Sequence, residues 1–287
     1  MPELPEVEAL RGFLADACVD KVVARTELVA FACLKTVAFP LSALHGLEVA
    51  DVQRRGKFIG LDVGGLWLAF HLARAGWLTW RTSVPTTPSR PGRGPLALRL
   101  AFDDDTGFDL TEAGTQKRLA VYVVERLEDV PGIASLGPDP LGPGFTPEVL
   151  ADLLARAGRS QLKGVLRDQR VIAGIGNAYS DEILHAARLS PFKPASGLTA
   201  DELARLHRAV TEGLAEAVGR ASGLAARELK GDKKLNLAVH GRTGQPCGVC
   251  GTTIAEVSFA DSSLQYCPGC QTGGKLLADR RLSRLLK

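Results

Sequence analysis

The chain has 287 residues, a formal net charge of +3 at pH 7 and 45% hydrophobic residues, which is enough for about two domains that each bury a sizeable core. Its first residues are acidic and lack an apolar run, which excludes a secretory signal peptide. The most apolar stretch, residues 59–80, is interrupted by Asp62, His71 and Arg74, which excludes a membrane span there.

Excess positive charge and most of the cysteine residues lie towards the C-terminal end. Between Ala226 and Lys287 there are ten Lys and Arg residues and five Asp and Glu residues, so this segment carries +5 and the rest of the chain −2. A basic excess favours a surface for a polyanion, although a charged solvated surface is the alternative. Four of the six cysteines also cluster late, which is typical of metal binding in a reducing cytoplasm rather than of a disulfide framework.

The first eight residues, Met-Pro-Glu-Leu-Pro-Glu-Val-Glu, allow two interpretations. Proline and glutamate are common at a helix start, and apolar residues recur at helical spacing from Val7 to Ala17, so the segment can simply begin a helix. Alternatively, removal of Met1 gives Pro2 a free secondary amine, which ionises nearer neutrality than a lysine amine. Such an amine can attack a sugar carbon to form an iminium ion, with Glu3 as the adjacent proton donor.

Eight short β-type runs follow and predict a β-sandwich or barrel. They are residues 22–23, 37–39, 49–52, 58–63, 66–71, 77–80, 96–102 and 120–124. Four prolines between Ser83 and Pro95 predict a long loop. Four prolines and four glycines between Pro131 and Gly144 predict an interdomain hinge.

The next part of the chain is predicted to be helical. Thr146-Pro147-Glu148 supplies an N-cap, a proline and an acid at the start of one helix, and a second helix runs from about Leu162 to Arg170. The glycine-bearing turn 173–177 leads into a third helix, and the capping box of residues 199–202 opens a fourth.

Two Cys-x-x-Cys pairs near the C-terminal end give the strongest single signal. Cys247 and Cys250 are separated by sixteen residues from Cys267 and Cys270, which is the spacing of a tetrahedral zinc site. Four cysteine ligands leave no open position, so this Zn²⁺ is structural. The segment is predicted to form a β-hairpin that is too small to fold without its metal.

Three further residues each have a functional and an ordinary interpretation. Asn177, after two glycines at a helix start, suits a phosphate clamp, but the turn can be a plain tight turn. Lys57 lies in a basic, hairpin-like stretch, where a solvated surface lysine is the common case. His71 lies among apolar residues, where a core histidine with satisfied hydrogen bonds is the common case.

Five motifs in order resemble the formamidopyrimidine-DNA glycosylase and endonuclease VIII family. They are Pro-Glu-Leu-Pro-Glu-Val-Glu at 2–8, Gly-Lys at 56–57, Gly-Ile-Gly-Asn-Ala-Tyr-Ser-Asp-Glu at 174–182, His-Gly-Arg-Thr-Gly-Gln-Pro-Cys at 240–247 and the paired Cys-x-x-Cys. The resemblance covers essentially the full length of the chain. Its opening is closer to the formamidopyrimidine branch than to the endonuclease VIII branch, which opens Pro-Glu-Gly-Pro-Glu.

The resemblance implies an α+β fold with two lobes. A β-sandwich lobe with an N-terminal helix would span residues 1–130 and a hinge residues 131–145. A helix–two-turns–helix lobe would span residues 146–235, followed by a four-cysteine zinc finger at 236–287. The implied partner is damaged double-stranded DNA, bound by a monomer in the bacterial cytoplasm and therefore associated with the nucleoid.

The resemblance also implies residue roles in a glycosylase that nicks DNA at the abasic site. Pro2 would attack C1′ of the damaged nucleotide, Glu3 would move protons, and Glu6 would support this acidic cluster. Three residues, Lys57, His71 and Asn177, would hold phosphates around the flipped nucleotide. Of these three, we group Lys57 with the catalytic residues. Further DNA contacts are predicted for Arg74, Arg118 and Lys163.

Four departures from the family pattern concern lesion recognition. Arg74 stands where the family has a wedge methionine, and Leu119 stands where it has an aromatic residue. Ser262 replaces an arginine of the zinc hairpin that binds phosphate in the family, and residues 222–242 are short for the loop that covers 8-oxoguanine. The resemblance therefore implies lyase activity on abasic DNA more directly than excision of 8-oxoguanine.

Two other classes of protein remain as alternatives. One is a DNA-binding relative that has lost its chemistry and uses the basic C-terminal segment for phosphate contacts. The other is a zinc-ribbon protein of a ribosome or transcription complex, which only the cysteine pairs support. Neither alternative explains the combination of Pro2, Glu3 and Lys57.

Overall fold

The structure, a computed structural model, describes residues 1–89, 94–259 and 262–278. The described chain divides into two compact units. The first contains Met1–Leu136 and Ala221–Lys230, and the second contains Gly137–Arg220 and Gly231–Lys287. Residues 221–230 belong to the first unit because Ala221, Ala226 and Leu229 join its hydrophobic core, although we predicted them in the helical lobe.

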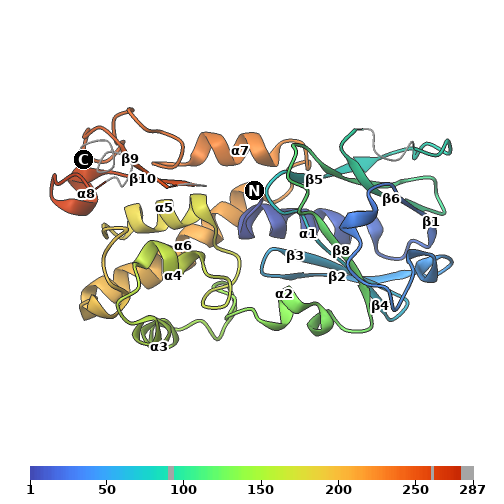
Figure 1. The fold of residues 1–287 in the computed structure, drawn as a ribbon, viewed down its shortest axis with the longest axis horizontal. Helices are drawn as coiled ribbons and strands as arrows, with labels where there is room; N and C mark the ends of the chain where they lie inside the picture. Colours follow the sequence, from blue (N-terminus) through green and yellow to red (C-terminus); the bar gives the residue numbers. More distant parts are fainter. Residues whose placement is uncertain (90–93, 260–261, 279–287) are drawn as a thin grey trace. The chain divides into compact units, whose positions relative to one another are not determined.

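Two four-stranded antiparallel sheets form the body of the first unit (Figure 1). One sheet has the order β1 (Val23–Leu28), β6 (Leu96–Phe102), β7 (Gly107–Glu112) and β5 (Gly76–Arg81). The other has the order β2 (Val49–Arg55), β3 (Phe58–Val63), β4 (Leu66–His71) and β8 (Ala120–Val124). The predicted α+β class with a β-sandwich lobe is confirmed.

The eight strands of these two sheets differ from the eight predicted runs at two places. Residues 37–39 do not form a strand, and Val37 is fully exposed, so β-branched composition alone misled the prediction. Strand β7 was missed because Asp109 and Glu112 interrupt its apolar pattern, yet both carboxylates are buried. The predicted loop 83–95 contains no strand among its described residues, and residues 90–93 lie outside the described part of the chain.

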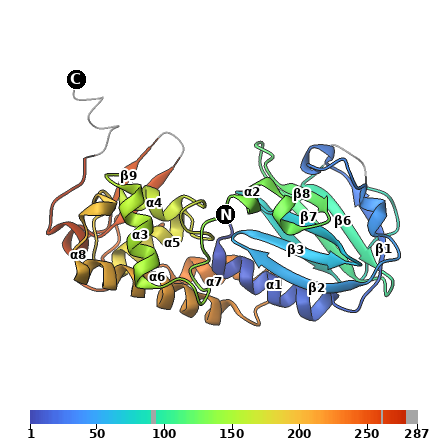
Figure 2. The same ribbon diagram turned by 90° about the horizontal axis from the view of Figure 1, so that it is seen from below.

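Helix α1 (Leu4–Cys18) packs against β2 and β3 (Figure 2). Its buried residues recur at helical spacing, as predicted, and include Leu4, Val7, Leu10, Leu14 and Cys18. This apolar face fixes the helix on the sheet. The first turn, which carries Glu3 and Glu6, is therefore held by the core beneath it.

The remaining helices include the predicted four. They are α2 (Pro131–Ala134), α3 (Pro147–Ala157), α4 (Leu162–Arg167), α5 (Asn177–Ala186), α6 (Ala200–Ala221), α7 (Leu229–Asn236) and α8 (Pro268–Thr272). Short 3₁₀ turns are η1 (Phe31–Cys33), η2 (Leu41–Leu44), η3 (Leu127–Asp129) and η4 (Ala195–Gly197). Among the described residues, no helix is long and apolar enough to cross a bilayer.

The predicted helix starts are confirmed by their caps. The Thr146 hydroxyl accepts from the Val149 N–H at 3.4 Å, as an N-cap does. Thr199 and Glu202 exchange hydrogen bonds of 2.8 and 3.2 Å in the predicted capping box. The zinc hairpin consists of β9 (Ala255–Ser258) and β10 (Ser263–Tyr266).

A buried ion pair joins β6 to β7 in the first unit. Arg99 Nε lies 2.7 Å from Asp109 Oδ1 and Arg99 Nη2 lies 3.1 Å from Asp109 Oδ2, with side-chain exposures of 9% and 2%. Removing one partner of such a pair leaves an uncompensated buried charge, which is more costly than losing an exposed pair.

We predict that Asp109→Ala lowers the free energy of unfolding by about 3–5 kcal/mol, because the Arg99 guanidinium stays buried without its main partner. Urea unfolding followed by circular dichroism measures this. The control is Glu128→Ala, which removes an exposed pair with Arg126 at 4.0 Å and should cost at most about 1 kcal/mol. Equal costs for the two variants would contradict the structural role of the buried pair.

Candidate active site and metal centre

The chain's first residues are buried at the start of α1. Pro2 is buried, and Glu3 and Glu6 are only 2% and 3% exposed. The Glu3 N–H donates to Glu6 Oε2 at 2.8 Å, and the two glutamates form a capping box. A capping box alone needs no burial, whereas two buried carboxylates beside a buried proline are unusual for a surface helix start.

Lys57 lies in the two-residue turn of the β2–β3 hairpin. Gly56, at the first turn position, has φ of +56°, which glycine adopts without strain. Lys57 is 7% exposed, so the structure contradicts the alternative of a solvated surface lysine. Almost fully buried lysines are rare unless they are paired or functional.

An ion pair ties this hairpin to α1. Arg54 Nε lies 2.7 Å from Glu8 Oε2, and Arg11 Nη2 lies 2.6 Å from Glu8 Oε1. Burial alone would raise the pKa of Glu8, but hydrogen bonds from Arg54 and Arg11 bring it below its ordinary value. Glu8 is therefore a charged anchor that joins the hairpin carrying Lys57 to the helix that follows Pro2.

His71, the last residue of β4, is held as a neutral donor. The Ala73 N–H donates to His71 Nδ1 at 3.1 Å, which leaves the proton on Nε2. Burial, together with the positive charge of Lys57, lowers the pKa of His71 to about 4. The ring also packs at 4.8 Å from the ring of Phe58. A neutral imidazole with an Nε2–H can donate to a phosphate without carrying a charge.

The loop after β4 presents Arg74 at the surface. The Gly76 N–H donates to the Leu72 carbonyl at 2.8 Å, and a Cβ at Gly76 would lie 2.0 Å from that carbonyl oxygen, so this turn requires glycine. Ala73 has φ of +52°, which places the following side chain, exposed Arg74, at the tip. The predicted DNA contact of Arg74 remains a prediction.

The second predicted contact loop has a buried carboxylate beneath it. Glu112 Oε1 accepts from the Arg118 N–H at 2.7 Å and from the Leu119 N–H at 3.0 Å. Arg118 is exposed, but Leu119 is 2% exposed and belongs to the first unit's core. Leu119 therefore serves packing, and only Arg118 remains available for the predicted contact.

In the second unit, the glycine-bearing turn leads directly into α5. Gly174 has φ of +88°, and its N–H donates to Gln169 Oε1 at 3.0 Å, while Gln169 Nε2 donates to the Ile175 carbonyl at 2.6 Å. Asn177 is half-buried at the first turn of α5, and its Nδ2 donates to the Ser263 carbonyl of β10 at 2.8 Å. The second Nδ2 hydrogen gives the amide a further donor for a phosphate.

The predicted DNA contact of Lys163 is contradicted by its surroundings. Its ammonium group donates to the Asn177 carbonyl at 2.6 Å, to Ser180 Oγ at 2.8 Å and to Asp181 Oδ1 at 2.6 Å. These contacts use all three of its hydrogens, and the residue is 4% exposed. Lys163 therefore braces the first turn of α5 from within and positions Asn177 rather than reaching a ligand.

Two acidic residues of α5 hold the zinc-finger segment. Asp181 Oδ2 accepts from His240 Nδ1 at 2.7 Å, and Glu182 accepts from the backbone N–H groups of residues 238, 239 and 240 at 2.6, 3.0 and 2.8 Å. Burial raises the pKa of Glu182 despite these three donors. Sequence reasoning missed both residues, although their position four and five residues after Asn177 places them on neighbouring faces of the same helix.

The four late cysteines come together as a metal site would require. The Sγ atoms are linked by separations of 3.9 Å (Cys247–Cys270), 3.4 Å (Cys270–Cys250) and 3.3 Å (Cys250–Cys267). Zinc–sulfur bonds of about 2.3 Å in a tetrahedron put sulfurs about 3.8 Å apart, so this donor set fits Zn²⁺. The ion would hold α8 and the loop before β9 together, which is a structural and not a catalytic role.

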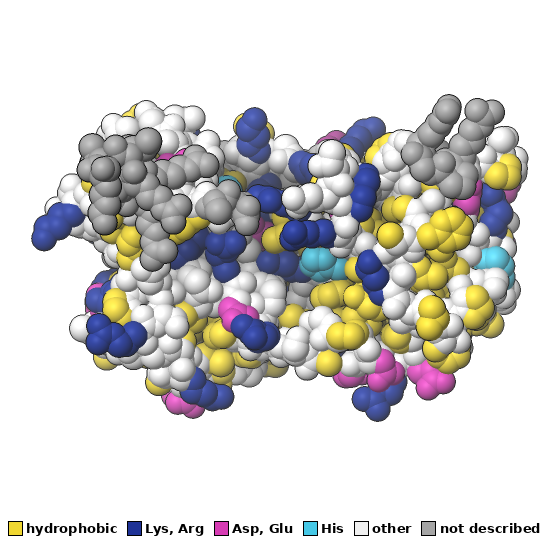
Figure 3. Space-filling view, viewed as in Figure 1, with side chains coloured by type: hydrophobic (Ala, Val, Ile, Leu, Met, Phe, Trp, Pro, Cys, Tyr) yellow, Lys and Arg dark blue, Asp and Glu magenta, His cyan; other side chains and the backbone are white. Residues whose placement is uncertain are grey.

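Basic side chains are more prominent than acidic ones on the face shown in Figure 3. Four of the ten basic residues counted in the C-terminal segment lie outside the described residues, at positions 280, 281, 284 and 287. The polyanion-binding surface predicted from that segment is therefore described only in part.

Sequence models of three known domains match the chain in succession. They are the formamidopyrimidine-DNA glycosylase N-terminal domain over residues 1–118, the formamidopyrimidine-DNA glycosylase H2TH domain over residues 136–227, and a zinc finger found in FPG and IleRS over residues 244–273. The last match supports the assignment of the cysteine cluster to one structural zinc ion.

Two curated proteins with similar sequences cover nearly all and about half of the chain, respectively. The formamidopyrimidine-DNA glycosylase of Symbiobacterium thermophilum is 36% identical over 296 residues, covering 98% of this chain and 93% of that protein. An uncharacterized formamidopyrimidine-DNA glycosylase-like protein of Mycobacterium tuberculosis is 58% identical over 153 residues, covering 53% of this chain and 95% of that protein.

Solved structures with the same fold include complexes with DNA. The MutM (Fpg) protein of Thermus thermophilus has a TM-score of 0.78 at 31% identity, covering 96% of this chain and 100% of that chain. The Lactococcus lactis Fpg in complex with abasic-site DNA has a TM-score of 0.83 at 26% identity, covering 94% and 99%. A MutM complex with DNA containing carbocyclic 8-oxo-G also has a TM-score of 0.83 at 26% identity, covering 94% and 100%.

The low pKa of His71 predicts a pH dependence of stability. The pKa is about 4 in the folded chain and 6.5 for an unperturbed histidine, so between these values the unfolded chain binds a proton that the folded chain does not. The free energy of unfolding therefore falls as pH falls through this window. His71→Phe removes this titration and should lose less stability between about pH 7 and about pH 5 than the wild type.

Urea unfolding of both proteins at the two pH values measures the difference. Other acidic groups titrate in both proteins and cancel in the comparison. The same loss of stability in wild type and variant would contradict the neutral state of His71.

Proposed function

The chain belongs to the formamidopyrimidine-DNA glycosylase family, and on that premise we propose which of its residues carry out the family's reaction. The protein is a base-excision DNA glycosylase with abasic-site lyase activity that acts on damaged DNA. We propose that Pro2 is the nucleophile, Glu3 the proton donor and acceptor, and Lys57 a cationic partner of the same site. The enzyme would work as a monomer in the bacterial cytoplasm, on the nucleoid, where its DNA substrate is.

One observation carries this assignment. Buried Pro2 is followed by two buried carboxylates, and the same unit buries Lys57. Burying charged groups costs free energy that a plain helix start would not incur. Active sites are where such costs are commonly borne, because charged groups there must be placed before the substrate arrives.

The reaction follows from a free amine at Pro2. After Met1 is removed, the lone pair of the Pro2 nitrogen forms a bond to C1′ as the bond from C1′ to the damaged base breaks. The base leaves with the bonding electrons and takes up a proton, which balances the proton that the Pro2 nitrogen loses. Glu3 donates a proton to the sugar ring oxygen, so that the ring opens and an iminium ion remains between Pro2 and C1′. The iminium acidifies C2′, loss of that proton breaks the bond from C3′ to its phosphate oxygen, and water releases the enzyme. Glycosylase and lyase steps therefore share one intermediate.

Three residues would each contact a phosphate of the DNA, two of them in the first unit and one in the second. Lys57 offers a charge, His71 a neutral Nε2–H and Asn177 an amide N–H at the positive end of α5. Backbone contacts of this kind fix the register of the DNA without reading its sequence. Glu6 supports the first turn by accepting from the Glu3 N–H. In this assignment, the predicted lobe 1–130 carries the chemistry and the predicted lobe 146–235 carries Asn177.

Lesion recognition would differ from that of relatives solved with 8-oxo-G DNA. An exposed arginine, Arg74, would fill the gap left by a flipped nucleotide, and Leu119 is packed in the core rather than presented to the opposite strand. Residues 229–236 form helix α7 within the stretch where the family has its covering loop. We propose that abasic sites are processed efficiently and that 8-oxoguanine is a poor substrate.

The proposed nucleophile predicts a covalent adduct. Sodium borohydride reduces the iminium, so incubation with an abasic duplex and borohydride should join the chain to DNA in a denaturing gel. Pro2→Gly should give much less adduct, because the secondary amine is replaced. An undiminished adduct with Pro2→Gly would contradict the assignment of Pro2.

Glu3→Gln is the companion variant. Loss of a general acid should slow adduct formation by about 10²- to 10⁴-fold. Binding to a reduced abasic analogue, which cannot react, should stay close to wild type and serves as the control for folding. A wild type that binds this analogue but never forms an adduct would support the alternative of an inactive DNA-binding relative.

The lesion preference predicts an order of rates on a panel of duplexes. The panel contains 8-oxoguanine, formamidopyrimidine, oxidised pyrimidines, an abasic site and an interstrand crosslink. Single-turnover nicking should be fastest on the abasic site, and Arg74→Met should raise the rate on 8-oxoguanine relative to the abasic site. If wild type cleaves 8-oxoguanine as fast as the abasic site, the proposed role of these departures is wrong.

A further inference from the structure

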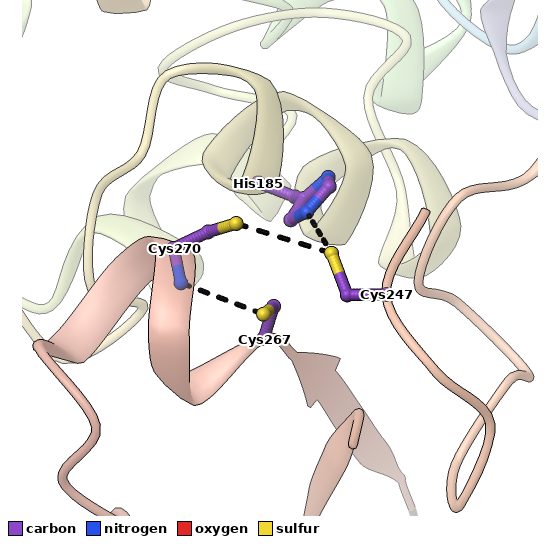
Figure 4. Close-up of side chains that lie close together, drawn as sticks. All are labelled: His185, Cys247, Cys267 and Cys270. Carbon is purple, nitrogen blue, oxygen red and sulfur yellow. Dashed lines mark hydrogen bonds between the residues drawn. The ribbon is translucent and has the colours of Figure 1, made fainter. Parts of the chain in front are cut away.

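A buried histidine lies beside the cysteine cluster. His185, near the end of α5, is 7% exposed, and its Nε2 lies 3.3 Å from Cys247 Sγ (Figure 4). His185 Nε2 and the sulfurs of Cys247, Cys267 and Cys270 all lie within 4.8 Å of one another. Neither the cysteine spacing nor the predicted four-cysteine site gives this residue a role.

The sulfur geometry argues against histidine as one of the four ligands. Separations of 3.3 to 3.9 Å link all four cysteine sulfurs, including exposed Cys250. Four thiolates complete the coordination of a structural zinc ion. His185 makes its 3.3 Å contact with Cys247, which places it next to one ligand.

The chemistry of a zinc-bound cysteine then sets the direction of the hydrogen bond. A thiolate has no proton, so it can only accept, and the His185 Nε2 must donate. Four thiolates and Zn²⁺ leave the site with two excess negative charges, and Cys247 and Cys267 are almost fully buried. Backbone N–H groups stabilise part of this negative charge. The Val249 N–H donates to Cys247 Sγ at 3.5 Å, and the Cys270 N–H donates to Cys267 Sγ at 3.4 Å. His185 adds a side-chain donor from outside the finger.

His185 also completes a row of contacts between α5 and the finger. Asn177 donates to the Ser263 carbonyl, Asp181 accepts from His240, and His185 lies against Cys247. These three residues are spaced four apart, so they lie along one face of α5. Figure 1 shows α5 beside the β9–β10 hairpin in the second unit. The metal site is therefore attached to the same helix that carries Asn177 at its start.

We propose that His185 is a positioning residue of the zinc site. It donates Nε2–H to the Cys247 thiolate, lowers the free energy of the loaded site and fastens the finger to α5.

The test compares the full-length wild type with His185→Phe and His185→Gln. Phenylalanine fills similar space without a donor, and glutamine keeps an N–H donor. The matched control is His207→Gln, which removes a half-buried histidine of the same unit whose Nε2 lies 2.9 Å from the Phe145 carbonyl oxygen, away from the cysteines. Zinc affinity is measured by competition with a colorimetric chelator, and circular dichroism checks the fold of each zinc-loaded protein.

The expected result is a 10- to 100-fold weaker zinc affinity for His185→Phe, about the loss usual for a partner that orients a metal ligand. His185→Gln should recover most of this loss, and His207→Gln should equal wild type. With Co²⁺ in place of zinc, wild type and His185→Gln should both show the absorption of four thiolate ligands. The thiolate charge-transfer band should shift in His185→Phe, because Cys247 loses its donor.

Two results would overturn the proposal. Equal zinc affinity in wild type and His185→Phe would mean that the contact has no energetic role. A wild-type Co²⁺ spectrum of three thiolates and one nitrogen, lost in His185→Gln, would make His185 a direct ligand. If His185→Phe fails to fold, the wild-type spectrum and the affinity of His185→Gln still decide between these roles.

Discussion

The proposed mechanism depends on one constraint, which is that its nucleophile is the backbone nitrogen of Pro2 after Met1 is removed. A chain terminus is normally the most mobile part of a protein, whereas an attacking nitrogen must be held within a fraction of an ångström of its path. The structure meets this constraint through α1. Its apolar face is buried on the sheet, its first turn is closed by Glu3 and Glu6, and the Glu8–Arg54 pair connects it to the hairpin that carries Lys57. Catalysis by a terminal amine thus requires the core beneath it.

In the second unit, side-chain contacts and a metal site hold the start of α5 in place. The proposed phosphate contact requires Asn177 to present its amide from the start of a helix of only ten residues, α5. Lys163 braces that first turn from inside, and Asp181, Glu182 and His185 hold the zinc-finger segment against the same helix. The segment is small, so its metal supplies the order that a hydrophobic core supplies elsewhere. Zinc thereby stabilises the surroundings of Asn177 without taking part in the chemistry.

Sequence patterns predicted what depends on local spacing. The apolar repeat of α1, the caps at Thr146 and Thr199 and the two Cys-x-x-Cys pairs are local signals, and the structure confirms the elements they predict. The sequence could not reveal that Asp109 is buried against Arg99, so β7 was missed. It also could not reveal the surroundings of Lys163 and His185, because their partners lie 18 and 62 residues away along the chain. Side-chain contacts between distant segments depend on the folded structure, so they cannot be predicted from local sequence patterns.

The most direct test of the account is the mass of the protein's first peptide in its active form. Protein that nicks abasic DNA is trapped on the strand with borohydride and digested, and the peptide that carries the sugar fragment is identified by mass spectrometry. The proposed mechanism predicts a chain that begins at Pro2, with the fragment on the Pro2 nitrogen. Active protein that retains Met1, or a fragment attached to Lys57 or another lysine, would contradict it.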